Sequence, residues 1–125
     1  MYKILVIDDE KPTLNMSRLL LGASGYNVVT AEGGVEGLEV FRREKPDIVI
    51  TDMKMPGYHG LEILGRMIDS GMDIPVVVVS AFDQLEHEFV VTAYPRLKFL
   101  PKPASPESVA AAIGVFVREA RGKGG

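Results

Sequence analysis

Three aspartates follow short apolar segments of this sequence in a pattern that suits metal-assisted chemistry. Asp8 and Asp9 come directly after Lys3–Ile7, and Asp52 comes directly after Ile48–Thr51. If these segments are neighbouring parallel strands, the carboxylates meet at the sheet edge where open α/β folds bind ligands. Crowded carboxylates repel one another. Mg²⁺ relieves that repulsion well, because it prefers oxygen ligands, needs few carboxylates and keeps several waters.

A hydroxyl group and an ammonium group follow two further apolar segments. Ser80 comes directly after residues 76–79, and Lys102 comes shortly after residues 97–100. A metal ion, a lysine, a hydroxyl and a lone carboxylate together resemble a phosphoryl-transfer site. The set therefore predicts Asp52 as a nucleophile that forms an acyl phosphate, with Ser80 and Lys102 binding the phosphoryl group.

Each of these residues also has a purely structural interpretation. Asp52 could start a turn, Ser80 could cap a strand, and Lys102 could be a solvated base, while the aspartates before helices could complement helix dipoles. Two acid-ended strands in one parallel sheet favour the functional interpretation. His59 and His87 are interpreted as solvated residues, and neither is predicted to be a phosphodonor or a metal ligand.

The elements that must position these residues alternate between strand and helix. Strands are predicted at 3–7, 27–31, 47–51, 75–80 and 97–100, and helices at 12–22, 35–45, 61–71, 83–93 and from 105 onward, with Ser105 as the last N-cap. Continuous apolar strands are typical of parallel sheets that are covered on both faces. The alternation predicts a doubly wound α/β fold with right-handed crossovers.

The composition limits the class of protein. The length of 125 residues suits one domain, and 46% hydrophobic residues can form a core. A net charge of -3 gives no electrostatic reason to expect nucleic acid as a direct ligand, and the lack of cysteine excludes disulfides and thiolate metal sites. The first residues do not resemble a signal peptide, and no apolar run is long enough to cross a bilayer. We expect a cytoplasmic protein with no membrane insertion.

The chain resembles the receiver domains of two-component response regulators, which are CheY-like in fold. The resemblance covers residues 3–117 and rests on four segments in order: Ile7–Glu10, Asp52–Gly57 with Gly60, Ser80–Ala81 and Lys102–Pro103. It implies a flavodoxin-like (βα)5 fold, with a five-stranded parallel sheet in the order 2-1-3-4-5 and helices on both faces. We accordingly expect a receiver domain over residues 1–121 and a flexible tail over residues 122–125.

The resemblance implies a metal site and a phosphorylation site. Asp52 is expected to accept a phosphoryl group from a histidine kinase or a phosphotransfer protein. Asp9 is expected to bind Mg²⁺ directly together with Asp52, while Asp8 contributes mainly through water. The backbone carbonyl of Lys54 is expected to complete the protein ligands.

The resemblance also implies a switch. Ser80 is expected to move toward the phosphoryl group, and Lys102 is expected to pair with it through a cis Lys102–Pro103 bond. Phe99 stands where the family has an aromatic residue whose rotamer follows the Ser80 movement. The chain is thus expected to be a phosphorylation-dependent switch and not an enzyme that acts on an external metabolite. Its output face would be the fourth helix, fifth strand and fifth helix, which often bind a second receiver.

The sequence departs from the family pattern near the expected output face. Pro95–Arg96 replaces the usual Gly-Ala pair before the last strand, and Ala104 replaces a common aromatic residue. A proline indicates a short, shifted or mobile fourth helix. Lys54 and Phe82 are expected to slow hydrolysis of the acyl phosphate, because they lie beside the path of an attacking water.

Three other functions fit the sequence less well. A phosphohydrolase that uses an aspartyl phosphate needs a second acid where this chain has Lys54. A phosphorylation-silent receiver that acts only as a protein-interaction module usually lacks one of the acids or the lysine, which are all present here. Flavin binding is disfavoured because Asp8 and Asp9 would repel a cofactor phosphate and no Ser/Thr-rich loop follows the first strand.

Overall fold

One parallel sheet forms the centre of the molecule. The computed structural model describes residues 2–53, 65–66, 68–71, 73–80, 96–101 and 105–124. Within them the strands are β1 (Lys3–Ile7), β2 (Asn27–Ala31), β3 (Ile48–Met53), β4 (Val76–Ser80) and β5 (Leu97–Pro101), and the helices with bounds are α1 (Lys11–Ala23), α2 (Gly34–Glu44) and α5 (Pro106–Gly124). The strands form a five-stranded sheet in the order β2-β1-β3-β4-β5, with parallel pairing throughout. The predicted fold and strand order are therefore confirmed.

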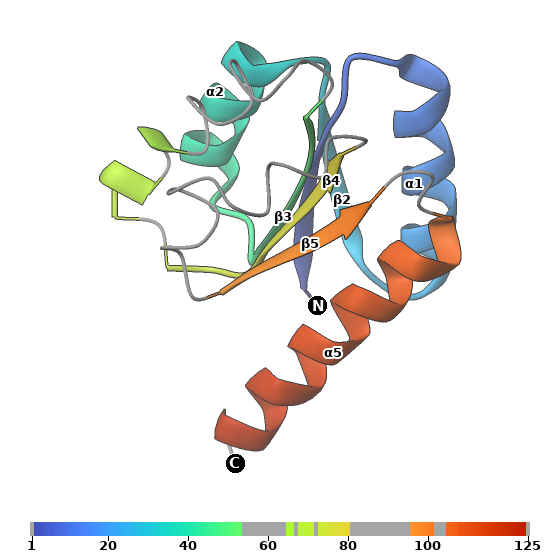
Figure 1. Cartoon of the computed structure of the whole chain (residues 1–125), viewed down its shortest axis with the longest axis vertical. Coiled ribbons are helices and arrows are strands. Elements are labelled where there is room, and N and C mark those ends of the chain that lie inside the picture. Colours follow the sequence, from blue (N-terminus) through green and yellow to red (C-terminus); the bar gives the residue numbers. More distant parts are fainter. Residues whose placement is uncertain are drawn as a thin grey trace.

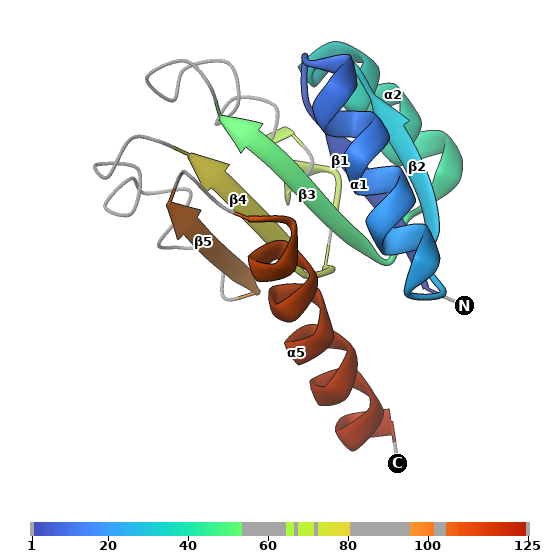
Figure 2. The same cartoon turned by 90° about the vertical axis from the view of Figure 1, so that its right-hand side faces the viewer.

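The helices lie on both faces of the sheet. α1 and α5 cover one face and contact each other, and α2 covers the opposite face (Figures 1 and 2). Side chains alternate between these faces along each strand. The face under α1 and α5 includes Ile4, Val6, Ile50 and Val77, and the face under α2 includes Leu5, Ile7, Val49 and Val78.

The burial of β4 accounts for its continuous apolar sequence. Val76, Val77 and Val78 are all 0% exposed, although successive side chains point to opposite faces. A strand with both faces covered has no solvent-facing positions that would need polar residues. Fully burying each of these side chains contributes roughly 1.5–3 kcal/mol, so this short strand anchors both halves of the core.

The ends of the helices follow local signals in the sequence. α1 ends before Gly25, whose φ of 95° is a conformation that favours glycine. α5 begins after Ser105, whose Oγ accepts a hydrogen bond from the backbone N–H of Ser108 at 3.0 Å, which confirms the predicted N-cap. α5 then runs past the amino ends of the strands to Gly124 (Figures 1 and 2). It includes residues 122–124, whose predicted flexibility stays a prediction.

β3 is longer than the predicted strand. β1 pairs with β3 only as far as Ile7 and Thr51, but β4 continues the pairing to Met53 and Ser80. Asp52 therefore lies inside the strand. The sequence pattern had indicated a position directly after the strand. The extra length comes from the neighbour β4 and has no local signal. Residues 65–66 and 68–69 are helical within the predicted helix 61–71, and the predicted helix 83–93 lies outside the described residues.

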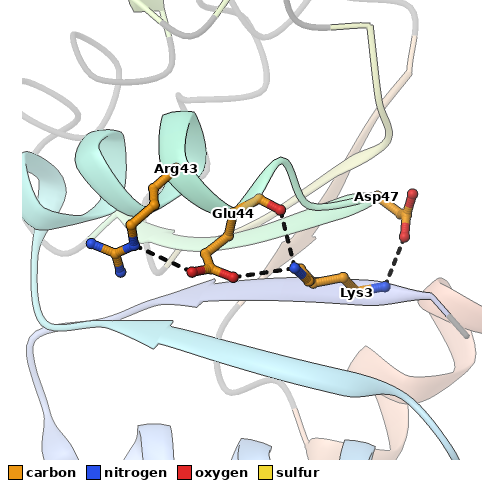
Figure 3. A network of polar contacts seen from close by, with 4 residues as sticks. All are labelled: Lys3, Arg43, Glu44 and Asp47. Carbon is orange, nitrogen blue, oxygen red and sulfur yellow. Dashed lines mark hydrogen bonds and ion pairs between the residues drawn. The ribbon is translucent and has the colours of Figure 1, made fainter.

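A network of polar contacts fixes the amino edge of the sheet. Lys3 Nζ donates to Glu44 Oε1 at 3.1 Å and to the Glu44 carbonyl at 3.2 Å, and its backbone N–H donates to Asp47 Oδ2 at 2.8 Å (Figure 3). Arg43 Nε lies 3.2 Å from Glu44 Oε2. The hydrogen bond from Lys3, and then that from Arg43, lowers the pKa of Glu44. The network joins the start of β1 to the end of α2 and the approach to β3.

Candidate functional site

The carboxyl ends of β1 and β3 bring two of the predicted acids together. Ile7 pairs with Thr51, so the next residues, Asp8 and Asp52, lie at the same level on adjacent strands. Because side chains alternate along a strand, both carboxylates point to the face that α1 and α5 cover. The predicted convergence of Asp8 and Asp52 at one edge thus has a direct basis in the β1–β3 register.

A cavity of about 450 Å³ opens beside these two carboxylates. Asp8, Asp52 and Glu10 contribute its acidic lining. Its apolar lining includes Met16 and Leu20 of α1, Val109 of α5, and Ile50 and Val79 of the sheet. The site is therefore a cavity with an acidic part and an apolar part between the sheet, α1 and α5.

Asp8 is held in place by backbone groups. Its side chain Oδ1 accepts a hydrogen bond from the Glu10 N–H at 2.9 Å, and its own N–H donates to the Ala31 carbonyl at 3.1 Å. The first contact is the Asx-turn that aspartates commonly make before a helix. The residue is only 8% exposed. A buried carboxylate in a fixed orientation is suited to binding a cation.

Asp9 has a different environment from its neighbour. Asp9 is exposed and is not among the residues that line the cavity, whereas Asp8 and Asp52 both line it. Asp52 is half-buried, and its Oδ1 atom is buried. That Asp9 binds Mg²⁺ directly and Asp8 mainly through water stays a prediction.

The donor set is compatible with Mg²⁺. Within the described ranges, no group of three or more Asp, Glu, His or Cys side chains is arranged to hold a metal ion. Mg²⁺ does not need such a cage, because it is usually bound by one or two carboxylates and keeps several waters. Asp8 and Asp52, which line the same cavity, provide oxygen ligands of the required kind.

The other predicted site residues are only partly described. Ser80 ends β4 opposite Met53, so its backbone lies at the same edge of the sheet as Asp52. Phe99 lies in β5 opposite Val78. The side chains of Ser80 and Phe99 lie outside the described part of the chain. The remaining residues named from the sequence are also outside it: Lys54, Gly57, His59, Gly60, Ala81, Phe82, His87, Pro95, Lys102, Pro103 and Ala104.

The sequence interpretation did not identify the residues of α1 and α5 that line the cavity. Glu10 orients Asp8 through its backbone N–H, and Thr13, Ser17 and Val109 line the walls. The Asx-turn had a visible signal, since an aspartate precedes Pro12 in the first turn of the helix. The contribution of Val109 had none, because it depends on how α5 packs beside α1.

Comparison with known protein families agrees with this geometry. The sequence model described as "Response regulator receiver domain" matches residues 4–114 of the chain. The chain belongs to the response regulator receiver family. It is therefore a receiver domain of the phosphorylation-dependent switches used in two-component signalling, as its four sequence segments predicted.

The curated relatives that this chain resembles are longer than the chain itself. It is 32% identical over 119 residues to response regulator MprA of Mycobacterium leprae, a match that covers 95% of this chain and 52% of the relative. It is 34% identical over 110 residues to the transcriptional regulatory protein GlrR of Escherichia coli, which covers 88% of this chain and 25% of that protein. The chain thus spans about half the length of MprA and a quarter of GlrR.

Solved structures with the same fold include receiver domains from two other bacteria. A receiver domain protein from Clostridium thermocellum is 31% identical with a TM-score of 0.82, and the match covers 97% of this chain and 98% of that one. Response regulator TrrA from Thermotoga maritima, solved in complex with Mg²⁺-BeF, is 28% identical with a TM-score of 0.79, and the match covers 93% and 99%. Among the described residues, no helix of this receiver domain is long and apolar enough to cross a membrane.

Proposed function

We propose that this receiver domain accepts a phosphoryl group on Asp52 from a histidine kinase or a phosphotransfer protein. The observation that carries the proposal is the position of Asp8 and Asp52, which line one cavity at the carboxyl edge of the sheet. In the proposed step, a carboxylate oxygen of Asp52 bonds to phosphorus while the bond between phosphorus and the donor nitrogen breaks. The donor imidazole keeps that electron pair, and Asp52 becomes an acyl phosphate.

Mg²⁺ is the cofactor that we propose for this step. Asp8, Asp9, Asp52 and the backbone carbonyl of Lys54 are the proposed ligands, and the Glu10 N–H keeps Asp8 oriented. When bound, the ion offsets the negative charge of the carboxylates and of the phosphoryl oxygens. The proposal is supported by the oxygen donors beside the cavity and by the Mg²⁺-BeF complex of the similar T. maritima protein.

Phosphorylation is proposed to shift an existing equilibrium between two arrangements. The added dianion draws the Ser80 hydroxyl and the Lys102 ammonium toward Asp52, and the Phe99 ring follows. The expected output face comprises the fourth helix, β5 and α5, and its proposed partners include a second receiver. The roles of these three side chains rest on the family resemblance.

The start of β5 carries one contact that bears on the output face. Arg96 Nη1 donates to the Asp73 carbonyl at 2.8 Å and lies 3.6 Å from Asp73 Oδ1. Arg96 belongs to the Pro95–Arg96 pair that departs from the family pattern. The contact ties the entry of β5 to the segment before β4. We infer that Arg96, through this contact with Asp73, restrains the start of β5 and alters which partners the output face accepts.

Phosphoryl uptake tests the proposed acceptor. Wild type is incubated with acetyl phosphate and Mg²⁺, and intact mass spectrometry measures the added mass of one phosphoryl group. We expect Asp52→Asn to abolish the addition and Asp69→Asn, an exposed aspartate outside the cavity, to retain it. Modification of Asp52→Asn at the wild-type level would contradict the assignment.

The alternative of a silent interaction module gives a different result in the same assay. A silent receiver would take up neither acetyl phosphate nor beryllofluoride, with or without Mg²⁺. A true phosphohydrolase would instead release phosphate from external substrates over many turnovers. The presence of Asp8, Asp9, Asp52 and Lys102 in one chain favours the phosphorylated switch over both. We also propose that it acts in the cytoplasm.

Lys54 is proposed to slow loss of the phosphoryl group. It stands two residues past Asp52, where a long cationic side chain can block or misorient the attacking water. Dephosphorylation of the phosphorylated wild type is compared with that of Lys54→Ala and Lys54→Asn. We expect faster hydrolysis in both variants, and an unchanged rate in both would refute the idea. The same dephosphorylation measurement tests the proposed role of Phe82.

A further inference from the structure

We propose that the outer edge of β2 binds an extended peptide segment of a partner protein, with an acidic side chain of the peptide beside Arg18. The peptide would join the sheet as a further strand and bond to backbone groups of Val28 and Thr30. This surface is separate from the proposed phosphorylation site, because the pocket beside it shares no lining residue with the cavity at Asp52. It would therefore hold a partner in both phosphorylation states.

The first support is a pair of backbone positions that the sheet leaves open. In the described sheet, β2 lies at one end and pairs with β1. The Asn27 N–H donates to the Tyr2 carbonyl, so the backbone groups of Asn27 face β1. Backbone groups of successive residues in a strand point to opposite sides, so those of Val28 and Thr30 point away from β1. We call Val28 and Thr30 the open pair.

The chain itself satisfies the outward N–H groups on either side of the open pair. The Tyr26 N–H donates to the Leu21 carbonyl at 3.2 Å, and the Glu32 N–H donates to Glu36 Oε2 at 2.8 Å. Within the part of the chain that the structure describes, no such hydrogen bond covers the outward groups of the open pair. Unpaired donors and acceptors at a sheet edge are a template for pairing with another chain.

The second support is the composition of β2. Edge strands are usually protected from further pairing by charged side chains, proline or bulges. β5, the strand at the other edge, carries the exposed Lys98 and ends at Pro101. β2 has neither a charged residue nor a proline, and its register with β1 is continuous. β2 is thus the edge of this sheet that remains open to a further strand.

The third support is a polar pocket beside the open pair. The pocket has a volume of about 220 Å³ and is lined by residues of α1, β2 and α2. Thr30 lines it from β2, Asn15 and Arg18 line it from α1, and Glu36 lines it from α2. The residue of an added strand that lies opposite Thr30 has its side chain on the same face as Thr30. That side chain would lie beside the α1 wall of the pocket.

Arg18 determines which charge this position favours. Its Nη2 donates to Thr30 Oγ1 at 2.7 Å, and among the described residues no carboxylate forms an ion pair with it. Lys11, by contrast, lies 3.6 Å from Glu32 Oε1. A guanidinium group has several N–H donors, so one bond to a hydroxyl leaves others for a carboxylate. Charge complementarity therefore favours a peptide with glutamate or aspartate opposite Thr30.

A second copy of this chain fits the edge less well than a single strand does. α1 and α2 both contact β2 and lie over its two faces (Figure 2). Pairing of β2 with its own copy about a two-fold axis is antiparallel and puts both α1 helices on the same face. The Lys11 and Arg18 side chains of the two copies would then approach each other, and like charges oppose that contact. An extended peptide brings no helices to the edge.

The test uses the peptide Ac-Thr-Val-Glu-Val-Thr-NH₂, titrated into ¹⁵N-labelled protein. Its sequence is the same in both directions, so either strand orientation can place the glutamate opposite Thr30. One control peptide has glutamine in place of glutamate, and another carries a methyl group on the glutamate nitrogen, which removes a backbone donor and keeps the charge. We expect the test peptide to shift the amide signals of Val28 and Thr30.

The two controls separate the contribution of charge from that of the backbone. The test peptide should bind about threefold more tightly than the glutamine peptide, as is typical of an exposed ion pair. It should bind at least about tenfold more tightly than the N-methyl peptide, which loses a strand hydrogen bond and clashes with the edge. Mg²⁺ with beryllofluoride should leave the affinity unchanged.

Two variants of the protein test the side chain and the backbone separately. Arg18→Glu should reverse the preference, so that a peptide with lysine in place of glutamate binds more tightly than the test peptide. Arg42→Glu is the matched control, because Arg42 is exposed on α2 and does not line the pocket. Val28→Pro removes an outward N–H and should weaken the test peptide at least about fivefold. The Arg18 reversal stands on its own if Val28→Pro does not fold.

Several results would overturn the inference. The absence of signal shifts at millimolar peptide, or shifts confined to other surfaces, would remove the site. Equal affinity of the test and N-methyl peptides would remove strand pairing, and an unchanged preference in Arg18→Glu would remove the role of its charge. A dimer that dissociates in Val28→Pro, measured by analytical ultracentrifugation without peptide, would show a second copy as the occupant. A change of affinity with beryllofluoride would contradict binding in both states. Phosphoryl uptake is measured separately, so failure of the proposed function is distinguishable.

Discussion

Asp8 and Asp52 line the same cavity because Ile7 pairs with Thr51 in the parallel register of β1 and β3. This arrangement requires the observed register of β1 with β3. A slip by one residue would move every side chain of β1 to the opposite face of the sheet. Asp9 would then replace Asp8 on the face of α1 and α5. The alternation of buried residues on both faces opposes such a slip and thereby protects the geometry of the site.

Mg²⁺ is expected to stabilise the folded domain through Asp8 and Asp52. A ligand that binds only the folded state at 100 times its dissociation constant adds about 2.7 kcal/mol. We expect Mg²⁺ to raise the Tm of wild type and to have a much smaller effect on Asp8→Ala and Asp52→Ala. Differential scanning fluorimetry over a range of Mg²⁺ concentrations measures this, with Asp69→Ala as the control. A full Mg²⁺ response in Asp8→Ala would exclude this carboxylate as a ligand.

A methyl group is expected to have opposite effects at two helical glycines. At Gly37 a Cβ would lie 2.7 Å from Ile7 Cδ1 and 3.0 Å from Ile7 Cγ1, so Gly37→Ala should destabilise the domain by about 1–3 kcal/mol. At Gly22 a Cβ meets nothing within 4 Å, so Gly22→Ala should stabilise it by about 0.5–1 kcal/mol. Urea unfolding of both variants measures the difference. Equal effects would contradict the close approach of α2 to β1.

The Lys3–Glu44 contact is expected to make stability depend on pH. The hydrogen bonds from Lys3 and Arg43 lower the pKa of Glu44 below its unfolded value. Their contribution is therefore present above the ordinary glutamate pKa of about 4.3 and is lost as the pH falls through the lowered value. Glu44→Gln should destabilise the domain at pH 7 and cease to differ from wild type at strongly acid pH. Urea unfolding at several pH values tests this, with Glu39→Gln on the exposed side of α2 as control.

The N-cap of α5 is expected to contribute to stability. Ser105 Oγ accepts the Ser108 N–H, and losing an N-cap acceptor typically costs about 1 kcal/mol. Ser105→Ala should therefore lower the free energy of unfolding by about that amount, while Ser105→Asp should retain most of the wild-type value. Urea unfolding monitored by circular dichroism provides the measurement. If the alanine and aspartate variants have the same stability, the cap does not contribute as described.

Local patterns of residues were enough to predict the sheet and the acids at its edge. The valine run of β4 and the apolar segments of β1 and β3 predicted strands that are covered on both faces. In the structure, side chains on both faces of these strands are buried. The aspartates after those segments predicted a site at the carboxyl edge. These features were predictable because hydrophobic periodicity and turn residues are local properties of the chain.

Contacts between distant segments set which side chains share the cavity. The length of β3 depends on its pairing with β4. Which of Asp8 and Asp9 lines the cavity beside Asp52 depends on the register of β1 with β3. The apolar wall needs Val109 of α5 beside Met16 of α1, residues that lie far apart in the sequence. Pairing and packing between distant segments depend on how the whole chain fills its core, and no local pattern of residues encodes that.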